Sequence, residues 1–234
     1  MLESGRILLL TNDDGVDAPG LAVLAGVARG FGTAHIVAPS GPRSGCGHTF
    51  NTHAVFGFEP RGERRHSVDG SPVDCVRLGL HHLAPNAEWV LSGINDGGNL
   101  GVDVYASGTV AAVREATLLG RPAIALSQYI AAGRPIDWER SARMATRVLE
   151  YLFAKPPDPG CYWTASLPHL ASDAPEPELV ECPIDHSPRR LDYDVEGDRA
   201  RFRGVYQDRA RLPGHDIDVC FSGSIAISHA RPAG

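Results

Sequence analysis

Short apolar runs and longer amphipathic segments alternate along the first two-thirds of the chain. The run RILLLT at 6–11 is stopped by polar turn residues, which is typical of a buried strand. The segment LAVLAGVARG at 21–30 follows as a helix and AHIVAP at 34–39 as a second strand, so a parallel sheet is predicted. The same patterns predict helices over 71–84, 107–120 and 137–153 and strands over 89–93 and 123–127.

Helix-capping residues support these boundaries. Ser71 is placed to cap the second predicted helix, with Pro72 at its first helical position and Asp74 in its first turn. Asp137 is placed to cap the amphipathic helix at 137–153 in the same way.

The pattern weakens in the last third of the chain. Residues 169–215 are rich in Pro, Asp and Arg with little periodicity, which predicts an irregular arm or hairpin, and SIAISHA at 224–230 predicts a strand. We therefore divide the chain into a core at 1–168, an arm at 169–215 that could form an oligomer contact, and a segment at 216–234 whose strand returns to the core.

Length, charge and cysteine content narrow the class of protein. A chain of 234 residues suits one α/β domain, and its net charge of −6 argues against a surface for a nucleic-acid polymer. Five cysteines without a CxxC pair suggest reduced thiols. No signal peptide and no apolar run long enough for a bilayer are apparent, so we expect a cytoplasmic protein without a membrane partner.

Polar, glycine-rich loops follow three of the predicted strands. The first carries Asn12, Asp13, Asp14 and Gly15, and the others cover 40–48 and 94–109. Because the carboxyl ends of parallel strands share one edge of a sheet, these loops should converge there. Two carboxylates, a hydroxyl and an amide would suit a hard divalent cation, Mg²⁺ or Mn²⁺. The alternative is that the aspartates only cap a helix, although one cap does not require two of them.

The sequence SGT at 107–109 opens a predicted helix, whose free amides and hydroxyls could bind phosphate. The nearby glycines could instead serve only tight turns. No Walker A loop, GxGxxG fingerprint, HExxH or GxSxG motif is present. Among the ten histidines, only His48 lies in one of the converging loops, whereas His229 has no sequence neighbours that single it out.

Four segments resemble the SurE family of survival nucleotidases. They are ILLLTNDDGVDAPG at 7–20, VAPSGPRSGCGH at 37–48, DGSPVDCVRLGL at 69–80 and the stretch from VLSGINDGGNLG to GRPAIALS at 90–127, with a fainter match at 214–228. The resemblance implies a Rossmann-like three-layer α/β/α fold with a mainly parallel sheet. It also implies a divalent-metal-dependent phosphomonoesterase that acts on 5′- and 3′-nucleotides.

The resemblance also assigns roles to residues. The family's metal ligands correspond to Asp13, Asp14, Ser44 and Asn95, so we expect one Mg²⁺ or Mn²⁺ per subunit. Asp13 and Asp14 would be the catalytic residues, with attack on phosphorus either by water or by one of these carboxylates. The phosphate of a small substrate would contact Asn99, Ser107, Gly108 and Thr109.

Several positions depart from the family pattern. Ser40 stands where relatives usually have Asp, Ala106 where they often have Tyr, and TASLP at 164–168 replaces a stretch with two amides. We assign Ser40, His48 and Ala106 to the substrate pocket. A phosphatase specialised for one biosynthetic intermediate and a metal- and nucleotide-binding module with little turnover remain alternatives. The family also implies a homodimer or higher homo-oligomer, although most of its longer C-terminal tail is missing here.

Overall fold

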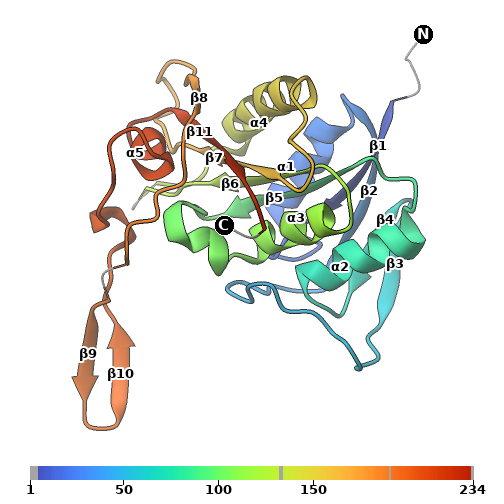
Figure 1. Ribbon diagram of the computed structural model, residues 1–234, viewed down its shortest axis with the longest axis horizontal. Coiled ribbons are helices and arrows are strands. Elements are labelled where there is room, and N and C mark those ends of the chain that lie inside the picture. Colours follow the sequence, from blue (N-terminus) through green and yellow to red (C-terminus); the bar gives the residue numbers. More distant parts are fainter. Residues whose placement is uncertain (1–4, 132–133, 190, 233–234) are drawn as a thin grey trace.

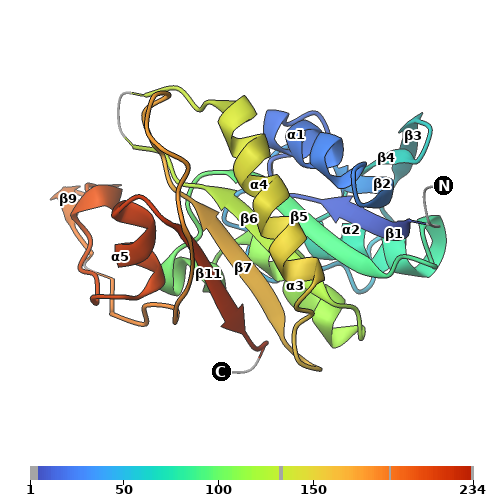
Figure 2. The same cartoon turned by 90° about the horizontal axis from the view of Figure 1, so that it is seen from above.

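A computed structural model describes residues 5–131, 134–189 and 191–232. A nine-stranded sheet in the order β3-β4-β2-β1-β5-β6-β7-β11-β8 forms the middle layer, and helices cover both of its faces (Figures 1 and 2). This arrangement confirms the predicted three-layer α/β/α fold.

Six strands of the main sheet share one direction, and β3, β8 and β11 run opposite to them. The antiparallel pairs are β3 with β4 and β11 with β7. The strands are β1 (Arg6–Thr11), β2 (Gly32–Pro39), β3 (Phe58–Gly62), β4 (Arg65–Val68), β5 (Trp89–Asp96), β6 (Ala123–Gln128), β7 (Tyr162–Leu167), β8 (Leu179–Glu181) and β11 (Ile225–Ala230).

The main helices are α1 (Pro19–Ala28), α2 (Pro72–Leu78), α3 (Gly108–Leu118), α4 (Trp138–Phe153) and α5 (Asp216–Phe221). The expected caps are confirmed, because Ser71 and Asp74 form a capping box on α2 and Asp137 accepts from the Arg140 amide at 3.0 Å. A π turn (Gly79–Leu83) continues α2, and 3-10 turns lie at Gly101–Tyr105 and Tyr206–Asp208.

The core has one cluster of apolar side chains on each face of the sheet. Leu8 and Leu10 of β1 pack with α1 and α4, whereas Leu9 points to the opposite face and packs with α2 and α3. Alternate side chains of a strand point to opposite faces, so the consecutive apolar residues at 7–10 of β1 are explained by helices that cover the strand on both sides. No helix within the described residues is both long and apolar enough to cross a bilayer.

Some elements were absent from the sequence interpretation. β7 was not predicted, although its six residues are all buried and Gly160 and Pro168 flank the run. The hairpin of β3 and β4 was missed as well, because all five residues of β3 are exposed and carry no hydrophobic pattern.

The segment expected to be an arm divides between core and surface. β8 pairs with β11 and becomes the last strand of the main sheet, so residues 169–215 are not wholly an arm. α5 precedes β11 in the segment that was expected to contribute a strand. β9 (Tyr193–Glu196) and β10 (Arg199–Phe202) form a separate antiparallel hairpin that extends away from the body of the molecule (Figure 1).

Candidate active site at the carboxyl edge of the sheet

The loops after β1 and β5 meet at the carboxyl edge of the sheet. The two strands are hydrogen-bonded neighbours, with Thr11 opposite Ser92. The chain turns sharply after β1, where Gly15 has a φ of +107° and its amide donates to Asn12 Oδ1 at 3.2 Å. This turn places the two aspartates beside the end of β5.

Asp13 is the centre of this site and is only 4% exposed. The Thr109 hydroxyl donates to Asp13 Oδ1 and also lies 3.2 Å from Asn95 Oδ1. Burial raises the pKa of Asp13, and hydrogen bonds from the Thr109 hydroxyl and from the backbone of Thr109 and Gly108 oppose that shift. Asp13, Asn95 and Thr109 therefore come together from β1, β5 and α3.

Asp14 is half-buried beside Asp13, and its Oδ2 accepts from the Asp96 amide at 3.0 Å. The pKa of Asp14 is raised to about 6, mainly by burial and also by the charges of Asp13 and Asp96, against the lowering effect of the Asp96 amide. The structure thus brings two carboxylates into an environment that disfavours their charge.

The donor set at this edge fits a hard divalent cation. Within the described residues, no Lys, Arg or His forms an ion pair with Asp13 or Asp14. The side chains that face the site offer carboxylate, amide and hydroxyl oxygens, which are the ligands that Mg²⁺ and Mn²⁺ prefer. Capping of a helix alone does not account for the pair, because α1 has no side-chain cap.

Gly108 lets the N-terminus of α3 approach Asp13 closely. A Cβ atom at Gly108 would lie 2.8 Å from Asp13 Cβ and 2.9 Å from Cys46 Sγ, so any side chain would displace one of them. Ser107 Oγ caps α3 by accepting from the Val110 amide at 3.1 Å. Its proton is still available to a ligand, since the cap uses the oxygen only as an acceptor.

The loop at 40–48 lies against both of these segments. The Arg43 amide donates to the Asp13 carbonyl at 2.7 Å, and the Gly47 amide donates to the Ala106 carbonyl at 3.1 Å. Ser44, expected as a metal ligand, is exposed on this loop, and no hydrogen bond joins its hydroxyl to another described residue. The structure brings this loop to the site, but no hydrogen bond links the Ser44 side chain to either aspartate among the described residues.

Cys46 was not singled out by sequence reasoning as a site residue. It is half-buried beside Asp13 and Gly108, and burial and the Asp13 charge raise the pKa of its thiol. A signal was available, because Cys46 lies in the same converging loop as Ser44.

Asn99 has a side-chain donor that is unpaired among the described residues. Its side-chain Nδ2 is buried and makes no hydrogen bond within the described residues. Its backbone amide donates to Ser127 Oγ at 3.3 Å, and Ser127 Oγ lies 3.1 Å from Ser166 Oγ. Ser166 belongs to the TASLP stretch at 164–168, so a residue of this stretch contacts the serine that accepts from the Asn99 backbone.

His48 pairs with a buried carboxylate of α3. Its Nε2 lies 2.9 Å from Glu115 Oε2, and Arg77 Nε donates to the other oxygen of Glu115 at 2.5 Å. Glu115 is 3% exposed, and a buried carboxylate requires such partners. One ring nitrogen of His48 thus pairs with Glu115 of α3, and the assignment of His48 to the substrate pocket stays a prediction.

The other two expected pocket residues lie at the rim. Ser40 directly follows β2, with its amide donating to the Val68 carbonyl at 2.8 Å, and its side chain is exposed. Ala106 is also exposed, next to Tyr105, whose side chain is 54% exposed. Both positions are therefore open to a bound molecule.

The C-terminal segment supports the loop at 97–105, which sequence reasoning did not anticipate. Asp216 Oδ2 accepts from the Gly101 amide at 2.7 Å, and the Tyr206 hydroxyl donates to the Gly98 carbonyl at 3.0 Å. Arg189 and Arg209 both form ion pairs with Asp103. A loop of the core thus takes its shape from residues far along the chain.

A family model and curated relatives match most of this chain. A family model described as "Survival protein SurE" matches residues 8–184. A putative 5′-nucleotidase of Synechocystis sp. is 47% identical over 223 residues, which cover 95% of this chain and 98% of the relative. A 5′-nucleotidase SurE of Paramagnetospirillum magneticum is 36% identical over 234 residues, which cover 94% of this chain and 88% of the relative.

A solved structure extends the agreement to the whole fold. The crystal structure of the SurE protein from Aquifex aeolicus has a TM-score of 0.85 to this chain at 25% identity and covers 97% of it, with 94% of its own length matched. The chain therefore belongs to the SurE family.

Proposed function

We propose that the protein is a divalent-metal-dependent phosphomonoesterase that hydrolyses nucleoside monophosphates or a related phosphorylated metabolite. The observation that carries this proposal is the convergence of Asp13, Asp14, Asn95 and Thr109 without a cationic partner among the described side chains. The relatives' name, 5′-nucleotidase, supports the reaction class.

Asp13, Asp14 and Asn95 would hold one Mg²⁺ or Mn²⁺ per subunit, with Ser44 as a further ligand from its loop. Such a cation would supply Lewis-acid polarisation of the phosphoryl group and a more acidic water. Thr109 holds Asp13 and Asn95 in register by contacting an oxygen of each. We favour water over a carboxylate as nucleophile, because both aspartates are needed as ligands.

The phosphate would be bound by donors that the fold leaves available. Asn99 Nδ2 is buried without a partner, and the Ser107 hydroxyl keeps its proton while it caps α3. Together with the N-terminus of α3 at Gly108 and Thr109, they can receive phosphate oxygens. These donors act in the transition state as well, since negative charge remains on the same oxygens.

The test is phosphate release from a panel of nucleoside 5′- and 3′-monophosphates and non-nucleotide phosphomonoesters, after dialysis against EDTA and with Mg²⁺ or Mn²⁺ restored. We expect turnover of nucleoside monophosphates only with the cation. Full activity in excess EDTA would refute the metal requirement. Turnover confined to a non-nucleotide ester would indicate a specialised phosphatase, and binding without turnover of any ester would indicate a binding module.

We also propose that the chain forms a homodimer or higher homo-oligomer through the β9–β10 hairpin. Tyr193 and Phe202 are opposite each other, and with Val195 they form an apolar face exposed at 52%, 53% and 71%. An isolated two-stranded hairpin is marginally stable in water, so this face favours a second copy of the chain as its cover.

Light scattering at micromolar concentration tests this assembly. Val195→Glu should shift the protein towards monomer, whereas Arg201→Glu on the other face of the hairpin is the matched control. A monomeric wild type would refute the proposed contact.

A further inference from the structure

The amino edge of the sheet carries a second group of side chains that suits a metal. β7 begins there and the antiparallel β11 ends there, with His229 opposite Trp163. Strands rise about 3.3 Å per residue, so the length of β7 separates this group from the aspartate pair by roughly 20 Å. The group is therefore independent of the site already described.

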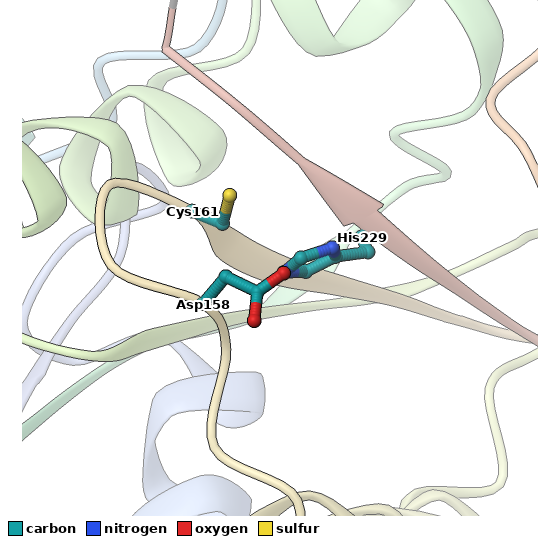
Figure 3. A group of neighbouring side chains, drawn as sticks. All are labelled: Asp158, Cys161 and His229. Carbon is teal, nitrogen blue, oxygen red and sulfur yellow. The ribbon is translucent and has the colours of Figure 1, made fainter.

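Three different ligand types converge at this edge. Asp158 lies in the loop before β7, Cys161 directly precedes β7 and His229 lies on β11 (Figure 3). One carboxylate oxygen, the Sγ atom and one imidazole nitrogen all lie within 4.8 Å of one another. Asp158 and Cys161 are three residues apart in the sequence, whereas His229 comes from a strand near the C-terminus.

Local structure holds this group together. The Cys161 amide donates to the Asp158 carbonyl at 2.9 Å across a turn in which Gly160 has a φ of +77°. The His229 ring lies 4.6 Å, centroid to centroid, from the indole of Trp163. The turn at 158–161 therefore sets the positions of Asp158 and Cys161, and the contact with Trp163 sets the position of the His229 ring.

The three side chains have no competing partners. No hydrogen bond or ion pair joins the Asp158 carboxylate, the Cys161 thiol or the His229 ring to another described side chain or backbone group. Cys161 is 2% exposed, whereas Asp158 and His229 are open to solvent. The buried Cys161 thiol is therefore held in place, and the exposed side chains of Asp158 and His229 can rotate towards it.

We propose that Asp158, Cys161 and His229 form a Zn²⁺ site. Thiolate, imidazole and carboxylate together are a zinc ligand set, and the soft sulfur disfavours Mg²⁺. A thiolate and a carboxylate also balance the charge of the ion. Tetrahedral bonds of 2.0–2.3 Å place ligand atoms about 3.3–3.8 Å apart, so rotamer changes of Asp158 and His229 would close the site.

The bound ion would join the 154–161 loop to the end of β11. Three protein ligands leave one tetrahedral position for water, as in zinc sites that are not fully enclosed by protein. Among the strands that the structure describes, β8 pairs with β11 alone. A metal contact at the end of β11 would therefore hold the C-terminal third of the chain to the core.

Co²⁺ provides the test, since a thiolate ligand gives a sulfur-to-cobalt charge-transfer band that an all-oxygen site lacks. The fully reduced protein is titrated with Co²⁺ and then Zn²⁺ in excess Mg²⁺, which occupies oxygen sites. We expect the band in wild type and its displacement by Zn²⁺. Cys161→Ser should abolish it, and Cys46→Ser, which removes the thiol beside Asp13, is the matched control that should keep it.

The two exposed ligands give an independent measure that does not depend on changing a buried residue. Asp158→Asn and His229→Gln should each weaken Zn²⁺ binding at least about tenfold, the lower end of what loss of even an outer-shell partner costs. Absence of the band at saturating Co²⁺, its survival in Cys161→Ser, or wild-type Zn²⁺ affinity in both exposed variants would overturn the proposal.

Discussion

The two edges of the sheet differ in how far their candidate metal ligands are buried. At the carboxyl edge, Asp13 and Asp14 are held together in an environment that raises the pKa of both carboxyls. At the amino edge, Asp158 and His229 are exposed and only Cys161 is buried. The carboxyl-edge ligands are already positioned in the metal-free protein, where their burial lowers its stability. The amino-edge ligands would reach their positions only when an ion binds.

The difference in donor atoms matters as much as the difference in burial. Oxygen donors alone suit a hard cation that exchanges readily and can act on a phosphate, whereas a sulfur–nitrogen–oxygen set suits zinc held more firmly. One fold thus carries two candidate metal sites that different ions should occupy.

The largest expected effect concerns Asp13, and it would separate the two edges most clearly. Asp13→Asn should lower kcat/KM for phosphate release at least about a hundredfold, because it removes a ligand and the partner of Thr109. Asp158→Asn, the same change at the other edge, should leave kcat/KM near the wild-type value. Equal losses in both variants would contradict the assignment of catalysis to the carboxyl edge.

Asp216 tests whether the carboxyl edge depends on the C-terminal segment. Its carboxylate accepts from the backbone amides of Gly101, Asp185 and Ile217, so Asp216→Ala should leave buried donors unpaired. Such donors cost about 1–3 kcal/mol each, and we expect a loss of that order in the free energy of unfolding, measured with urea. Asp218→Ala on the same helix is the control, and an equal loss there would indicate that α5 is generally fragile.

Ser40 and Ala106 test whether exposed residues beside the carboxyl-edge site set its substrate specificity. We expect nucleoside monophosphates to be cleaved less efficiently than by typical relatives, because each lost hydrogen bond costs about 0.5–1.5 kcal/mol. Ser40→Asp with Ala106→Tyr should raise kcat/KM for them about tenfold. If wild type already matches typical relatives and the double variant gains nothing, these positions do not set specificity.

The smallest effect concerns the charge of Asp14 in metal-free buffer. Its pKa is about 6 in the folded protein and near 3.8 when unfolded, so ionisation opposes folding, and stability from this group falls as pH rises from about 4 to 6. Asp14→Asn should therefore raise the apo melting temperature at pH 7.5, and the difference should vanish below pH 4. A lower melting temperature for the variant at pH 7.5 would make Asp14 structural.

Local sequence was sufficient to predict the elements that the site needs. Apolar runs located β1, β2, β5 and β6, and the caps at Ser71 and Asp137 are confirmed. The rule that parallel strands end at one edge then placed Asp13 and Asn95 together. Strand order beyond β6 was out of reach, because β11 lies between β7 and β8 although it follows both in sequence.

The sequence by itself therefore determined the fold class, the family and the convergence of the β1, β2 and β5 loops, because these depend on short-range periodicity and motifs. Only the tertiary structure decided which side chains have partners. It turned His48 towards Glu115 and placed Asp216 under Gly101. It also brought His229 to Asp158 and Cys161. Such pairings join residues that are 67 to 115 positions apart in the chain and that share no local pattern, so burial and packing, rather than spacing, select them.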